Sequence, residues 1–316
     1  MKKTNESRQY LILAVIAVLA IASIATVVYY QTRSNNDENL NDSKNQYSFK
    51  NVEGNHLNFS YSNIKEGIQY IPEGAFCVNI IKIKENGTIH NYLEEIQPGI
   101  NATEIMVGHF ETGAVEYYVI DNEHNATIMI DGNKPEYEGY NGYNYIVNKK
   151  LSFQRLLTGN PFLILTAYDG TIEGLGKDVI DVISSDKKGT KDFDNILIYA
   201  DDVSDYENLY VYMVDETQKY YHRSSSFENG SFQFEVIVLN PNTNIRDNLI
   251  QMTQNKTETI SYNVTETGNI MKIYINGENE SLYLEKTQEL YNIVFSEYNH
   301  QLFESSGMLD KLTAQT

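Results

Sequence analysis

One long apolar stretch near the beginning of the 316-residue chain constrains the fold more than any other feature. Residues 9–32 carry no charge, and between Leu11 and Val28 only Ser23 and Thr26 are polar. A helix rises about 1.5 Å per residue, so about 20 such residues cross a hydrocarbon core of about 30 Å. We therefore predict that residues 9–32 form a single transmembrane helix, retained as a signal anchor.

The charges in front of this stretch predict its orientation. Lys2, Lys3 and Arg8 precede it, and positive charge is retained on the cytoplasmic side of a membrane. Residues 1–8 are therefore predicted to be a cytoplasmic tail, with the rest of the chain outside the cell. The alternative is a signal peptide cleaved near Ser23–Ala25; we prefer the anchor because a signal peptide's apolar region usually has about 7–15 residues.

The segment after the apolar stretch is almost entirely polar. Within residues 33–46 Leu40 is the only aliphatic residue, which is too little apolar surface to order a chain. This segment is predicted to be a disordered linker. Residues 47–316 are predicted to form an extracellular β-rich region, organised as one wide sheet with helices or as two modules at about 47–160 and 190–316.

Composition excludes one class of partner and one kind of stabilisation. The formal net charge of -19 repels phosphate backbones, so nucleic-acid binding is excluded. Cys77 is the only cysteine, so the ectodomain is held together by packing and not by internal disulfides. Its apolar surroundings predict a buried, unreactive thiol.

Sequons for N-glycosylation are spread over the predicted ectodomain. Each consists of an asparagine followed two positions later by Ser or Thr, the acceptor pattern for glycan in a secreted protein. The asparagines are Asn41, Asn58, Asn86, Asn101, Asn125, Asn229, Asn255, Asn263 and Asn279. We predict a glycoprotein.

Short β-prone runs separated by turn residues dominate the rest of the sequence. Runs rich in Ile, Val, Tyr and Phe with near-alternation favour strands, and Asn-Gly between two runs favours a hairpin. The predicted strands are 76–84, 114–120, 126–130, 194–199, 209–214, 231–239, 269–275 and 281–284, with turns at Asn86-Gly87, Asp131-Gly132 and Asn276-Gly277.

Two stretches are predicted to be helical. Leu151–Leu157 is predicted to be a short mid-chain helix ended by Gly159, and residues 285–312 to be a C-terminal helix packed on the last sheet. The fold class expected is therefore an N-terminal transmembrane helix plus a β-rich ectodomain, all-β or α+β, with antiparallel sheets. An open half-barrel that carries lipid also fits strands interrupted by a helix.

Familiar catalytic motifs are missing from the sequence. Gly170–Lys177 lacks the spacing of a phosphate-binding loop and is predicted to be a turn. The histidines are too far apart for a zinc helix and are interpreted as solvated turn residues; they are His56, His90, His109, His124, His222 and His300. Carboxylate pairs for glycoside hydrolysis are too numerous to recognise by spacing, so a membrane-anchored hydrolase stays an alternative.

One acidic segment is a candidate calcium site. Its four carboxylates, which belong to Asp201, Asp202, Asp205 and Glu207, are hard oxygen ligands of the kind that Ca²⁺ takes. The order of residues differs from an EF-hand loop, so a solvated acidic loop is the simpler interpretation. No other cofactor is expected.

A glycine-spaced tyrosine cluster is a candidate contact surface. Tyr137, Tyr140, Tyr143 and Tyr145 place flat rings with polar tips close together, which suits stacking on sugars or contact with a protein. The simpler interpretation is the solvated face of a sheet.

The sequence therefore predicts a single-pass surface glycoprotein whose ectodomain binds a partner or contributes to the cell envelope. Glycan, lipid or a surface protein are the partners considered, and the membrane is contacted through the N-terminal helix. The alternatives are a lipid carrier and the anchored hydrolase.

Overall fold

The computed structural model describes residues 44–83, 102–121, 126–131, 134–147, 153–167, 172–184, 188–200, 205–214, 217–254 and 257–295. The predicted transmembrane helix at 9–32 and the hairpin turn at Asn86-Gly87 lie outside these residues. Within them, no helix has both the length and the apolar character needed to cross a membrane.

The chain divides into two compact units, residues 1–192 and 193–316. Residues 161–189, which fall outside both predicted modules, belong to the first unit. The modules at about 47–160 and 190–316 stay a prediction.

Unit 1 is built on an antiparallel sheet whose strands follow the order β3-β4-β5-β11-β9-β8-β7. The strands are β3 (Cys77–Lys82), β4 (Ala102–Phe110), β5 (Gly113–Ile120), β7 (Glu136–Tyr140), β8 (Tyr143–Val147), β9 (Gln154–Leu157) and β11 (Phe162–Ala167).

Two small pairings complete the strands of unit 1. The strand β1 (Lys44–Ser48) pairs antiparallel with β6 (Thr127–Asp131), and β2 (Leu57–Asn58) pairs parallel with β10 (Gly159–Asn160). Residues 44–46, which were predicted to belong to the linker, lie in β1, and the rest of that segment lies outside the described residues.

Unit 1 also contains short helices. They are η1 (Phe49–Asn51), α2 (Ile64–Gly67), η2 (Ile68–Tyr70) and α4 (Ile172–Ile183). Asn63 accepts a hydrogen bond from the Glu66 amide at 3.0 Å and so begins α2. The buried face of α4 packs on β9 and β11.

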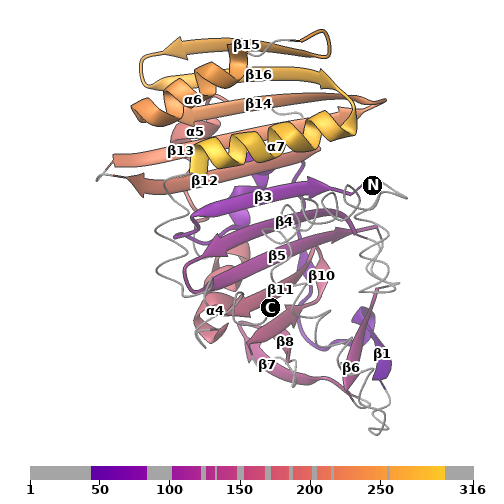
Figure 1. Ribbon diagram of the computed structural model, residues 1–316. Coiled ribbons are helices and arrows are strands. Elements are labelled where there is room, and N and C mark those ends of the chain that lie inside the picture. Colours follow the sequence, from indigo (N-terminus) through magenta and orange to yellow (C-terminus); the bar gives the residue numbers. More distant parts are fainter. Residues whose placement is uncertain are drawn as a thin grey trace, which may run out of the picture. The chain divides into compact units, whose positions relative to one another are not determined.

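Unit 2 contains a second antiparallel sheet, in the order β15-β16-β14-β13-β12. Its strands are β12 (Tyr206–Val214), β13 (Thr217–Glu228), β14 (Ser231–Leu239), β15 (Ile260–Thr267) and β16 (Ile270–Glu278). Figure 1 shows these strands in orange to yellow, with the yellow helix α7 lying across them.

The helices of unit 2 are α5 (Asp194–Leu197), α6 (Thr243–Gln254) and α7 (Glu280–Phe295). The last of these packs on β14 and β16, as predicted for a C-terminal helix, and Tyr283 stacks on Phe234 with ring centroids 5.1 Å apart. Buried Leu290 and Val294 lie on its inner face. The predicted continuation to 312 lies outside the described residues.

The mid-chain helix predicted at Leu151–Leu157 is wrong. Residues 154–157 form β9, paired with β11 on one side and β8 on the other. Pairing on both sides outweighs the weak helical preference of four residues. A helix lies instead at α4, which begins inside the predicted turn Gly170–Lys177 and continues to Ile183, because Leu175, Val179 and Ile180 recur at helical spacing and are buried.

Two strand predictions are also wrong. Residues 194–199 form the short helix α5 and the turn after it, since Phe193, Ile196 and Leu197 are buried at helical spacing. Asn276-Gly277 is no turn, because β16 continues through it to Glu278, and residues 281–284 lie in α7. The strand is extended there by pairing with β14 and β15 on its two sides.

Candidate functional site

The most concentrated polar cluster of unit 2 is organised around His222, in the middle of β13. The register places His222 opposite Leu209 on β12 and Ile237 on β14. Glu207 and Glu235 both lie opposite Ser224, two residues further along β13. Because side chains two residues apart share a face, the imidazole and both carboxylates lie on the same face of the sheet.

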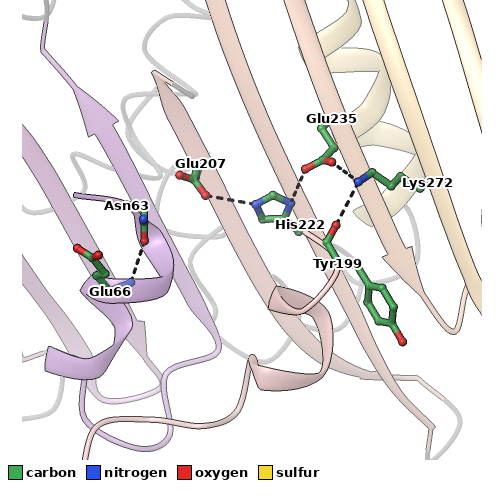
Figure 2. A network of polar contacts seen from close by, with 7 residues as sticks. All are labelled: Asn63, Glu66, Tyr199, Glu207, His222, Glu235 and Lys272. Carbon is green, nitrogen blue, oxygen red and sulfur yellow. Dashed lines mark hydrogen bonds and ion pairs between the residues drawn. The ribbon is translucent and has the colours of Figure 1, made fainter. Parts of the chain in front are cut away.

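Figure 2 shows the imidazole ring between the two carboxylates. Nε2 of His222 lies 3.4 Å from an oxygen of Glu207, and Nδ1 lies 3.8 Å from an oxygen of Glu235. The other oxygen of Glu235 is 2.5 Å from Nζ of Lys272, on β16. Nζ of Lys272 also donates to the Tyr199 carbonyl at 3.1 Å, which ties the segment after α5 to the sheet.

This cluster is buried. The His222 side chain is fully buried and those of Glu207 and Glu235 are 5% exposed. Of the two carboxylates, that of Glu207 lies within hydrogen-bond distance of the ring, whereas 3.8 Å is too long for a hydrogen bond from Nδ1 to Glu235. The interpretation of His222 as a solvated turn residue is therefore wrong: its charged neighbours on adjacent strands make burial possible.

The opposite face of the same strand carries a buried arginine. Arg223 stacks between two aromatic rings, with its guanidinium carbon 4.8 Å from the centre of Tyr206 and 5.9 Å from that of Phe234. Together these contacts explain how β13 holds His222 and Arg223 in adjacent positions without exposing either. In the sequence, two adjacent basic residues, His222 and Arg223, stand within a β-prone run and so fall on opposite faces of the strand. This is the signal that could have indicated a buried polar strand.

The candidate calcium residues are only partly described. Asp201 and Asp202 lie outside the described residues. Asp205 is half-buried and its amide donates to the Ser225 carbonyl, whereas the Glu207 carboxylate faces His222. Among the described residues no group of three or more His, Cys, Asp or Glu side chains could hold a metal ion.

Two of the four tyrosines in the candidate cluster, Tyr140 and Tyr145, contact α4. Tyr140 donates to Asp181 at 2.8 Å, and Tyr145 is buried beside Gly176, where a Cβ would lie 2.9 Å from the Tyr145 hydroxyl oxygen. Burial raises the pKa of Tyr145 above its usual value. Tyr137 and Tyr143 are half-buried, and Tyr137 lies on the opposite face of the sheet from the other three.

Unit 1 has its own buried acid, which sequence analysis did not single out. Glu116, at the centre of β5, is fully buried between Val107 of β4 and Ile164 of β11. Tyr118 donates to one of its oxygens at 2.5 Å, and the other has no hydrogen-bond partner among the described residues. Burial raises the pKa of Glu116 from 4.5 to about 8, which the Tyr118 hydrogen bond partly offsets.

Four of the nine sequon asparagines lie in the described residues, and all four are exposed. Asn58 ends β2, Asn229 lies at the tip of the β13–β14 hairpin, Asn263 lies in the middle of β15, and Asn279 precedes α7. The other five, Asn41, Asn86, Asn101, Asn125 and Asn255, lie outside the described residues.

Comparisons with known proteins do not assign a family. No family model and no curated protein matches the chain. Among solved structures the chain is similar to crystal form IV of TP0453, at 6% identity and a TM-score of 0.41, covering 68% of this chain and 94% of that one. Crystal form I gives 7% identity, a TM-score of 0.40, and 71% and 97% coverage. Likeness at this level carries no argument about function.

Proposed function

We propose that the chain is a single-pass, membrane-anchored surface glycoprotein whose β-rich ectodomain acts by binding a partner or by contributing to the cell envelope. The observation that carries this proposal is the placement of the sequons. All four that fall in described residues put their asparagine on the surface, at a strand end, a hairpin tip, an edge strand and a helix start.

The local geometry at Asn279 illustrates how a glycan is accommodated. Its side-chain oxygen accepts a hydrogen bond from the Leu282 amide at 2.9 Å and so begins α7. N-glycosylation uses the side-chain nitrogen, which is not the atom that begins the helix. Glycan attachment and helix capping are therefore compatible at this position.

The polar cluster around His222 gives no support to the hydrolase alternative. A hydrolytic carboxylate pair must reach a substrate and a water molecule. Glu207 and Glu235 are only 5% exposed, on either side of a fully buried ring. We therefore assign this cluster to the stability of unit 2 and not to catalysis.

Mass spectrometry of the chain purified from its native membranes tests the proposal. We expect the peptide containing residues 2–8 to be retained and glycan to be present at Asn229, Asn263 and Asn279. Asn248 is the matched control, since it lies outside any sequon and must be unmodified. Protease added to intact cells should remove ectodomain peptides and leave residues 1–8 protected.

A chain that begins after residue 23, or bare sequons at all three positions, overturns the proposal. Extraction of the same sample with organic solvent separates the lipid carrier from the preferred function, because a carrier releases lipid in a fixed ratio to protein.

A further inference from the structure

The strand β15 forms an edge of the unit 2 sheet. Among the described residues it pairs with β16 on one side only. Ile260 and Tyr262 are buried on one face, while Ser261, Asn263 and Thr265 are exposed on the other. The unpaired backbone groups along an edge strand are a template for pairing with another chain.

The composition of β15 offers little protection against such pairing. It contains no proline, glycine or lysine, and it is rich in β-branched residues that favour strands. Its only charged residue, Glu266, is paired with Arg246 of α6 at 2.8 Å. A strand of this length with high β propensity and low net charge is the kind that associates edge to edge.

The edge strand of the unit 1 sheet is protected differently. The strand β7 has five residues, two of which are Glu136 and Glu138, and Pro135 directly precedes it. Charge, short length and a neighbouring proline are recognised devices against edge pairing. The strand β15 is longer, has no neighbouring proline and carries one charged residue, which is paired with Arg246, but it has a sequon at its centre.

We propose that an N-glycan on Asn263 shields the edge of β15 and prevents it from pairing with β15 of a second copy of the chain. The proposal rests on the proposed function, which places the ectodomain where glycan is attached. Asn263 is exposed, and Thr265 completes its sequon on the same face.

The spacing between neighbouring strands leaves little room for a glycan on Asn263. A strand that joins the edge lies about 4.8 Å away, and side chains directly opposite have Cβ atoms about 5 Å apart. An antiparallel pairing of two β15 strands centred on the strand places Asn263 opposite either Asn263 or Thr265 of the second copy. A branched sugar on the exposed face is wider than this spacing, so it overlaps the side chain or the second glycan directly opposite it and disfavours the pairing.

The test compares variants of the full chain, produced in a glycosylating host and solubilised in detergent, by light scattering coupled to size-exclusion chromatography. Asn263→Gln and Thr265→Ala both remove the sequon, and we expect the protein mass per particle to double. Thr265→Ser keeps the sequon and should keep the wild-type mass. Asn229→Gln, which removes a glycan from a hairpin tip, should also keep it.

One further variant separates shielding of the edge from a general effect of sugar on solubility. Asn263→Lys lacks the glycan but places a positive charge at the centre of the edge, and we expect the wild-type mass because two such edges repel each other. If Asn263 carries glycan in the wild type and the Gln and Ala variants keep the wild-type mass, the shielding proposal is wrong while the glycoprotein proposal stands. A bare Asn263 with glycan at other sequons also overturns shielding alone.

Discussion

The two units bury carboxyl groups in their sheets by different means. In unit 1, Glu116 is surrounded by apolar side chains and has one hydroxyl partner, so burial raises its pKa to about 8 and it stays protonated at neutral pH. In unit 2, Glu207 and Glu235 lie beside His222, and Lys272 neutralises Glu235. A sheet can therefore bury an acid either by keeping its proton or by supplying opposite charge.

The largest effect is expected from replacing the His222 imidazole, which lies between the Glu207 and Glu235 carboxylates. His222→Phe leaves Glu207 without its partner in a buried site, and we expect unit 2 to lose about 3–5 kcal/mol of unfolding free energy. Hydrogen exchange of peptides from β12 and β13, read by mass spectrometry, measures the loss. Adding Glu207→Gln to this variant should recover part of it, because the amide carries no charge; no recovery would contradict the charge-pairing account.

The second largest effect on stability is expected from Glu116, the buried acid of unit 1 that keeps its proton. The folded pKa of Glu116 is about 8 and the ordinary value is 4.5, so between these pH values the unfolded chain releases a proton that the folded chain retains. The stability of unit 1 therefore falls as pH rises through this window, by up to about 1.4 kcal/mol per pH unit.

Glu116→Gln removes this dependence while keeping the shape and the acceptor for Tyr118. At pH 7 we expect unit 1 of the variant to be more stable than the wild type by roughly 3 kcal/mol. Hydrogen exchange of β4, β5 and β11 peptides at pH 5, 7 and 8.5, corrected for the intrinsic rate, measures this difference. An unchanged slope with pH in the variant would show that Glu116 is already ionised in the folded unit.

The smallest effect on stability is expected from Lys272, at the edge of the polar cluster around His222. Lys272→Met removes the counter-charge of Glu235, but the lysine side chain is 20% exposed and water screens part of the interaction. We expect a loss of about 1–2 kcal/mol in unit 2. Urea unfolding followed by circular dichroism measures it, and Lys177→Met, at an exposed helix pair, is the control that should change little.

The strands were the most predictable part of the fold. The runs at 114–120, 209–214 and 231–239 lie within β5, β12 and β14, because β-branched and aromatic residues are concentrated there. The errors fall where local preference is weak. Four-residue segments such as β9 and α5 are decided by what they pack against, which a single sequence does not show.

The buried cluster around His222 in unit 2 was also missed by sequence analysis, but for a different reason. His222 meets its partners only through the register of neighbouring strands, and a shift of one residue in either pairing would turn Glu207 or Glu235 to the other face. The sequence shows three separate charged residues in three strands. It contains no local pattern that aligns them.

The Asn276-Gly277 pair has a consequence for how the protein ages. In a mobile turn such a pair loses ammonia readily, because backbone rotation lets the glycine backbone nitrogen attack the asparagine side-chain carbonyl. Here both residues are held in β16 between two paired strands, and a Cβ on Gly277 would overlap the Phe232 ring. The backbone rotation required for this attack is blocked, so the folded chain protects this asparagine from slow conversion to an acid.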